Sequence, residues 1–132
     1  MRILFIEDDM IETMKLQRAI SKLPTKHQII EAKNGEEAIQ KLQEQPLPDL
    51  VLLDLNMPRM SGIEFLTYLK GNDKLRYLPT VILTTSENRS DLLTCFEIGI
   101  AGYVIKPLKY EDYEEKLRRV FEYWEISELV KG

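Results

Sequence analysis

Apolar residues of this chain gather in short runs that alternate with longer amphipathic stretches. The short runs end abruptly at polar residues, which is typical of buried parallel strands. We predict five strands, at residues 2–6, 28–32, 50–53, 80–83 and 102–105. The run Leu50–Leu53 is the most apolar, so we expect it to lie near the centre of a sheet.

After each predicted strand, apolar residues recur at helical spacing. We predict helices at residues 11–23, 36–45, 63–70, 90–98 and from 111 to the late 120s. Pro24 and Pro46 end the first two, and Asp9 is a suitable N-cap for the first. The last helix places one set of large side chains on a single face: Tyr113, Leu117, Val120, Phe121 and Trp124.

Five successive strand–helix units predict a single α/β domain over residues 1–132, with a doubly wound, five-stranded parallel sheet of flavodoxin-like type. In open sheets of this kind, the functional site lies at the carboxyl ends of the strands. The residues that directly follow the predicted strands are therefore the candidates for chemistry.

Five polar residues are brought to this edge by the predicted topology. The first strand delivers Glu7 and Asp8, the third Asp54, the fourth Thr84 and the fifth Lys106. Each of them alone has an ordinary explanation, such as helix capping or a solvated surface position. Together they place three carboxylates, a hydroxyl and an ammonium at one edge of one sheet.

Three carboxylates in one cleft repel each other unless they take up a proton or bind a cation. Oxygen ligands suit Mg²⁺, and no His or Cys adjoins these residues in the sequence to favour zinc. A magnesium site with Lys106 opposite suits a phosphoryl group, whose charge both cations would neutralise. Asp54 then has the chemistry of a nucleophile that forms an aspartyl phosphate, and Thr84 that of a hydrogen-bond donor to it.

The same residues lie in segments that resemble response-regulator receiver domains, of the stand-alone, chemotaxis-regulator-like kind. The resemblance spans essentially the whole chain, and the order and spacing of its segments are highly specific. The matching segments are ILFIEDD at 3–9, LLDLNMP at 52–58, SG at 61–62, LTTS at 83–86 and GYVIKP at 102–107.

The resemblance implies a role for each matched position. Asp54 would be the phosphoacceptor, and Asp8 would bind Mg²⁺ directly while Glu7 acts mainly through a water. The backbone carbonyl of Asn56 would be a further metal ligand. Tyr103 would be an aromatic switch that changes rotamer when Thr84 moves toward the phosphate.

Further expectations follow from the resemblance. Thr84 and Lys106 would contact the phosphate, and the Lys106–Pro107 bond would be cis, which would aim the lysine into the cleft. The phosphodonor would be a histidine kinase, a histidine phosphotransfer protein or a small phosphodonor. The chain would thus be a signalling protein rather than an enzyme, catalysing only its own phosphorylation and dephosphorylation.

The output surface would consist of the fourth helix, the fifth strand and the fifth helix, and the same face could form a homodimer. Because the sequence ends after the last helix, we expect no DNA-binding or enzymatic output domain. Residues 75–86 and 121–124 also resemble, over a shorter length, the regulators that partner bacterial phytochrome kinases, so a phytochrome-type sensor is one possible partner.

Composition and charge argue against nucleic-acid binding, a membrane span and a disulfide within the chain. The net charge of −4 gives no electrostatic basis for binding nucleic acid, and no apolar run approaches membrane-spanning length. A single cysteine, Cys95, excludes a disulfide within the chain and fits a cytoplasmic protein. We expect Cys95 to be a packing residue, and His27 to be a solvated loop residue.

Several alternatives stay open. Tyr103 could be a packing residue with its hydroxyl hydrogen-bonded rather than a switch. A phosphatase of the haloacid-dehalogenase type also uses a strand-end aspartate and Mg²⁺, but its second acid corresponds to Asn56 here. A flavin-binding protein of the same fold would need a hydroxyl- and glycine-rich loop where this chain has Glu7, Asp8 and Asp9. A receiver that serves only as a docking module is the third alternative.

Overall fold

The computed structural model describes residues 1–57 and 59–130 and confirms the alternation of strands and helices. The strands are β1 (Arg2–Ile6), β2 (Gln28–Ala32), β3 (Leu50–Leu53), β4 (Thr80–Thr84) and β5 (Gly102–Ile105). The helices are α1 (Met10–Ser21), α2 (Gly35–Leu42), α3 (Gly62–Gly71), α4 (Arg89–Ile98) and α5 (Tyr110–Ile126).

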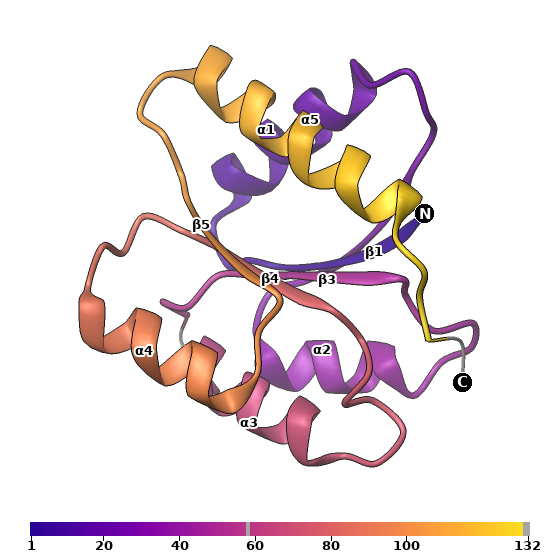
Figure 1. The fold of residues 1–132 in the computed structure, drawn as a ribbon, viewed down its shortest axis with the longest axis vertical. Helices are drawn as coiled ribbons and strands as arrows, with labels where there is room; N and C mark the ends of the chain where they lie inside the picture. Colours follow the sequence, from indigo (N-terminus) through magenta and orange to yellow (C-terminus); the bar gives the residue numbers. More distant parts are fainter. Residues whose placement is uncertain (58, 131–132) are drawn as a thin grey trace.

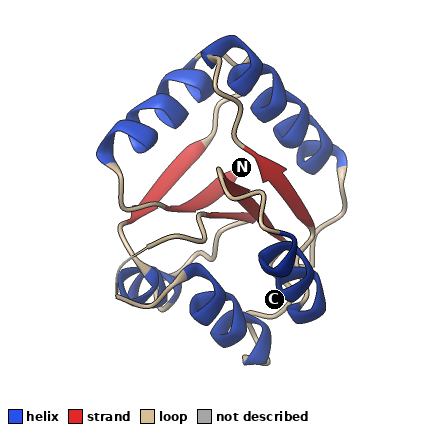
Figure 2. Ribbon diagram, turned by 90° about the vertical axis from the view of Figure 1, so that its left-hand side faces the viewer, coloured by secondary structure: helices blue, strands red, loops and turns tan. Residues whose placement is uncertain are grey.

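All five strands pair in parallel in one sheet, in the order β2-β1-β3-β4-β5. Helices α1 and α5 cover one face, and α2, α3 and α4 cover the other (Figure 1). The turned view shows the sheet between its two helical layers (Figure 2). The predicted doubly wound α/β fold is therefore confirmed, and β3 is the central strand.

Alternate side chains of β1 enter two separate cores, as the pleat of a strand requires. Ile3 and Phe5 pack with the residues of α1 and α5, whereas Leu4 and Ile6 pack with those of α2 and α3. All four side chains are almost fully buried. Burial on both faces explains why this strand is a continuous apolar run rather than an alternating one.

The helix ends are set by local hydrogen bonds. Asp9 caps α1 as predicted, because its Oδ1 accepts from the backbone N–H of Ile11 at 2.8 Å. Ser61 and Glu64 form a capping box at the start of α3. The prediction for α2 was wrong at its end, since the helix stops at Leu42 rather than at residue 45. The polar residues that follow have no apolar face to pack against the sheet.

The long helix α5 places its predicted face inward, with Tyr113, Leu117 and Phe121 buried. This packing overturns the expectation that His27 is solvated. Its side chain is fully covered, lies 5.2 Å from the Phe121 ring between centroids, and has Nε2 2.9 Å from Glu125 Oε1. The loop sequence gave no sign of this contact, because it depends on how far α5 extends. Cys95 is buried as expected.

None of the helices formed by residues 1–57 and 59–130 has both the length and the apolar character needed to cross a membrane.

Gly62 allows the start of α3 to lie directly against the end of β3. A Cβ at this position would lie 2.5 Å from the backbone oxygen of Asp54 and 2.6 Å from the Cα of Leu55. The backbone N–H of Gly62 donates to the Leu55 oxygen at 3.1 Å. A side chain at residue 62 would therefore collide with the backbone that carries Asp54.

We expect Gly62→Ala to destabilise the protein by about 1–3 kcal/mol, because the added methyl would collide with backbone that has no room to move. Gly71 at the other end of α3 is the matched control, since a Cβ there meets nothing within 4 Å. Gly71→Ala should be neutral or stabilising by up to about 1 kcal/mol. Urea unfolding of both variants measures this, and equal stabilities would contradict the assigned role of Gly62.

Candidate functional site

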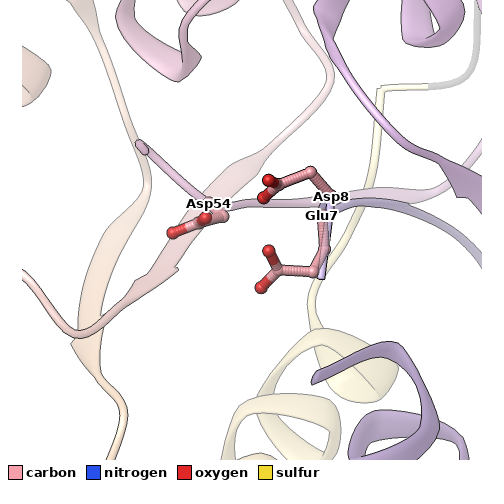
Figure 3. Close-up of side chains that lie close together, drawn as sticks. All are labelled: Glu7, Asp8 and Asp54. Atoms are coloured by element: carbon pink, nitrogen blue, oxygen red, sulfur yellow. The ribbon is translucent and has the colours of Figure 1, made fainter. Parts of the chain in front are cut away.

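Three carboxyl groups meet at the carboxyl edge of the sheet. Glu7, Asp8 and Asp54 each offer an oxygen, and these oxygens all lie within 4.8 Å of one another. In Figure 3, Glu7 and Asp8 leave the end of β1 on opposite sides and both reach toward Asp54. The backbone N–H of Asp54 donates to the Ile6 oxygen at 3.1 Å, which extends the pairing of β1 with β3. The sheet itself therefore sets the distance between these acids.

The acids line an open cavity of about 260 Å³. Glu7 and Asp54 lie at its floor, almost fully buried, whereas Asp8 is exposed. The lining residues are Glu7, Asp8, Asp9, Glu12, Asp54, Asn56, Thr85 and Lys106. Four of the five residues predicted from the strand ends thus share one cleft, and the fifth, Thr84, is fully buried at the end of β4.

Lys106 provides the positive charge of the cleft. Its backbone N–H donates to the Thr84 oxygen at 2.8 Å, which extends the pairing of β4 with β5. Its Nζ lies 2.7 Å from Glu7 Oε1 and 3.4 Å from Glu12 Oε2, and the side chain is only 6% exposed. Lys106 is thus a buried cation that two carboxylates hold in place.

The predicted cis bond between Lys106 and Pro107 is wrong. Among the described residues, the cis peptide bond joins Gln45 to Pro46. Lys106 nevertheless points into the cleft, because Glu7 and Glu12 attract its ammonium group.

Burial and the neighbouring charges shift the pKa values of Glu7, Asp54 and Lys106. Burial raises the pKa of Glu7 to about 7, although its hydrogen bond to Lys106 opposes the shift. Burial also raises the pKa of Asp54, opposed first by the charge of Lys106 and then by a hydrogen bond from Glu7. For Lys106, burial lowers the pKa, but Glu7, Glu12 and Asp54 outweigh it and raise the pKa overall. Below a pH of about 7, Glu7 therefore holds a proton.

Thr84 and Tyr103 are connected through Ser86. The Thr84 hydroxyl oxygen accepts from the backbone N–H of Ser86 at 3.3 Å, and the Tyr103 hydroxyl donates to the Ser86 backbone oxygen at 3.0 Å. A hydrogen bond from Thr84 also lowers the pKa of Asp54. One short segment therefore links the candidate acceptor to the candidate switch.

Asn56 lies at the mouth of the cleft with its side chain exposed, and its backbone hydrogen-bonds to Asp54. The loop that follows is tightly turned, since Arg59 and Met60 have φ values of 50° and 67°. Arg59 also pairs with Glu36 of α2 at 3.2 Å. Pro58, the last residue of the matched segment LLDLNMP, lies outside the described residues.

Glu12 is the residue of the cleft that the sequence did not indicate. It lies in the first turn of α1, five positions after Glu7, and faces Lys106 across the cleft. An acid in the first turn of a helix is ordinarily explained by the helix dipole alone. Its position beside Lys106 depends on the direction of α1 relative to the sheet. A short sequence motif does not reveal this direction.

Comparison with known proteins identifies the family of this chain. The family model of the response regulator receiver domain matches residues 3–118. The probable methanogenesis regulatory protein FilR2 of Methanothrix harundinacea is 35% identical over 127 residues, covering 92% of this chain and 82% of that protein. Response regulator Rcp1 of a Synechocystis species is 31% identical over 128 residues, covering 92% and 87%.

Solved structures are similar over almost the whole chain. The Mn²⁺-bound form of Rcp1 has a TM-score of 0.89 at 31% identity and covers 98% of each chain. The phosphorylated cyanobacterial phytochrome response regulator RcpA has a TM-score of 0.91 at 27% identity and covers 97% of this chain and 96% of its own.

The matched family model, the identity to Rcp1 and the five-stranded parallel fold lead to one conclusion. The chain belongs to the response regulator receiver domains, the phosphoacceptor proteins of two-component signalling.

Proposed function

We propose that Asp54 accepts the phosphoryl group, in a Mg²⁺ site formed with Glu7 and Asp8. The observation that carries this proposal is the position of Asp54. It is a buried carboxylate with an oxygen within 4.8 Å of oxygens of two further acids, and the cation of Lys106 lies at the same edge of the sheet. A phosphoryl group on Asp54 would extend into the open part of the cleft.

The residues present fit a magnesium ion. All three acidic side chains offer oxygen, which is the ligand type that Mg²⁺ prefers, and the cleft leaves room for retained waters. Asp8 and Asp54 would hold the ion directly, Glu7 through a water, and Asn56 through its backbone carbonyl. The related Rcp1 has been crystallised in a Mn²⁺-bound form. When bound, the ion would neutralise charge on the phosphoryl oxygens.

Transfer to Asp54 requires little chemistry beyond positioning. An ionised Asp54 oxygen attacks phosphorus, the bond from phosphorus to the donor breaks, and the donor leaves with the bonding electrons. Lys106 then compensates charge on the phosphoryl oxygens, and Thr84 donates a hydrogen bond to one of them. Glu7 holds Lys106 at the edge of the reaction site.

Phosphorylation of Asp54 would change the position of Tyr103 through the hydrogen bonds of the Ser86 backbone. A reorientation of Thr84 toward the phosphate would disturb its contact with the Ser86 backbone, to which the Tyr103 hydroxyl also bonds. Tyr103 lies on β5, half-buried, and packs against the core cluster that includes Cys95 of α4. The surface of α4, β5 and α5 would then change for a protein partner or for a second copy of the chain.

A histidine kinase or histidine phosphotransfer protein is the proposed donor, and the likeness to the phytochrome response regulator RcpA suggests a phytochrome-type kinase. Exposed apolar side chains on the first turns of α1 support a protein donor, because this helix also carries the cleft residue Glu12. Met10, Ile11 and Met14 are 72%, 68% and 62% exposed. Such a patch beside a reactive group is typical of a protein-binding surface.

The first test is intact mass after incubation with acetyl phosphate and Mg²⁺. We expect a gain of one phosphoryl group that requires the metal and is absent in Asp54→Ala, because the nucleophile is removed. A gain that persists in Asp54→Ala would assign the acceptor elsewhere. Turnover of phosphate esters by the unmodified protein would instead favour a phosphatase.

The same measurement with a panel of phosphorylated histidine kinases tests the protein donor. We expect Met14→Glu to slow transfer from a kinase on the order of tenfold, because it places a charge in the apolar patch. It should leave the reaction with acetyl phosphate unchanged. Equal slowing of both reactions would show that Met14 does not act through docking.

The raised pKa of Glu7 predicts that Mg²⁺ binding depends on pH. Below a pH of about 7 the metal-free protein holds a proton on Glu7 that the metal must displace, so affinity should fall by up to about tenfold per pH unit. Above this pH the affinity should level off. Isothermal titration in two buffers of different ionisation enthalpy would count the proton released.

The matched variant for this prediction is Glu7→Gln, which keeps the shape of the side chain but has no proton to lose. Its Mg²⁺ affinity should be weaker at high pH and should vary less between pH values of about 6 and 8. A variant with the same pH dependence as the native chain would show that the proton resides elsewhere.

A further inference from the structure

The Lys106 ammonium lies close to two carboxylates, those of Glu7 and Glu12. Of these, only Glu7 belongs to the proposed metal site. Glu7 Oε1 lies 2.7 Å from Nζ, and Glu12 Oε2 lies 3.4 Å from the same nitrogen. Glu7 accepts a hydrogen bond from the ammonium, whereas Glu12 attracts it by charge without a hydrogen bond. Glu12 therefore attracts the same cation that a phosphoryl group on Asp54 would need.

The two carboxylate oxygens of Glu12 have different surroundings. Its Oε1 lies 3.5 Å from Lys15 on the same helix, whereas its Oε2 is buried and has no hydrogen-bond partner among the described residues. The ammonium of Lys106 is the charge that this buried oxygen faces. The side chain of Glu12 is 22% exposed, so water screens the pair only in part.

We propose that Glu12 is a positioning residue, which holds the Lys106 ammonium toward α1 in the unphosphorylated protein and thereby slows phosphorylation of Asp54. The inference rests on the proposed function of Asp54. Any movement of the Lys106 Nζ toward a phosphoryl oxygen on Asp54 would have to act against the attraction of Glu12, whose Oε2 lies 3.4 Å away. The acid thus sets how readily the cation is available to the incoming group.

Three variants separate this role from a general effect of charge. Glu12→Gln removes the charge, whereas Glu12→Asp keeps it but shortens the side chain by one methylene, which breaks the contact with Lys106. Glu37→Gln is the control, because Glu37 occupies the same third position of α2 that Glu12 occupies in α1. It removes the same favourable interaction with a helix dipole away from the cleft.

The rate of phosphorylation by acetyl phosphate at saturating Mg²⁺ is the first readout. We expect Glu12→Gln and Glu12→Asp both to raise it on the order of threefold to tenfold, and Glu37→Gln to leave it unchanged. An unchanged rate in both Glu12 variants would overturn the proposal. An increase in Glu12→Gln alone would also overturn it, since charge rather than contact would then be responsible.

The second readout does not require phosphorylation. The ¹³Cε and ¹⁵Nζ resonances of Lys106, assigned through Lys106→Arg, should shift in the unphosphorylated Glu12 variants and not in Glu37→Gln. If these signals shift but the native chain takes up no phosphoryl group, the proposed function fails while the contact stands. If the native chain is phosphorylated and the Lys106 signals do not respond to Glu12, the positioning role is refuted.

Discussion

Repulsion between carboxylates at the ends of β1 and β3 is the constraint on which the site depends. Parallel pairing forces Glu7 and Asp54 to the same edge, and both are almost fully buried there. Two buried acids cannot both ionise unless a positive charge compensates them. Lys106 supplies one such charge, and a metal ion would supply more. The cleft is therefore arranged to receive cations, and through them an anionic group.

Backbone hydrogen bonds of the sheet fix the floor of the cleft. Backbone hydrogen bonds extend the strand pairing to Asp54 and to Lys106, so both positions are fixed by the sheet. Gly62 lets α3 lie against the backbone of Asp54. The residues that would respond to phosphorylation, Thr84 and Tyr103, are instead joined through the backbone of Ser86, which lies beyond the end of β4. A movement of Thr84 can thus alter the position of Tyr103 through the backbone of Ser86.

The sequence alone predicts the floor of the cleft, because the hydrophobic pattern reveals where the strands end. Asp54 directly follows the most apolar run, and a parallel topology then implies its neighbours. Contacts between distant elements were not visible in this way. His27 is buried because α5 reaches it, and Glu12 faces Lys106 because of the angle at which α1 leaves the sheet. Neither contact has a periodicity or a spacing that a single sequence could reveal.

The most direct test of the phosphoacceptor site is a crystal structure with Mg²⁺ and beryllium trifluoride, which mimics an acyl phosphate. We expect beryllium on an oxygen of Asp54 and Mg²⁺ at about 2.1 Å from oxygens of Asp8 and Asp54. We also expect Nζ of Lys106 within hydrogen-bond distance of a fluoride, at roughly 2.8 Å. Beryllium bound at another side chain, or an Asp54 left bare with both ligands in excess, would show that Asp54 is not the phosphoacceptor.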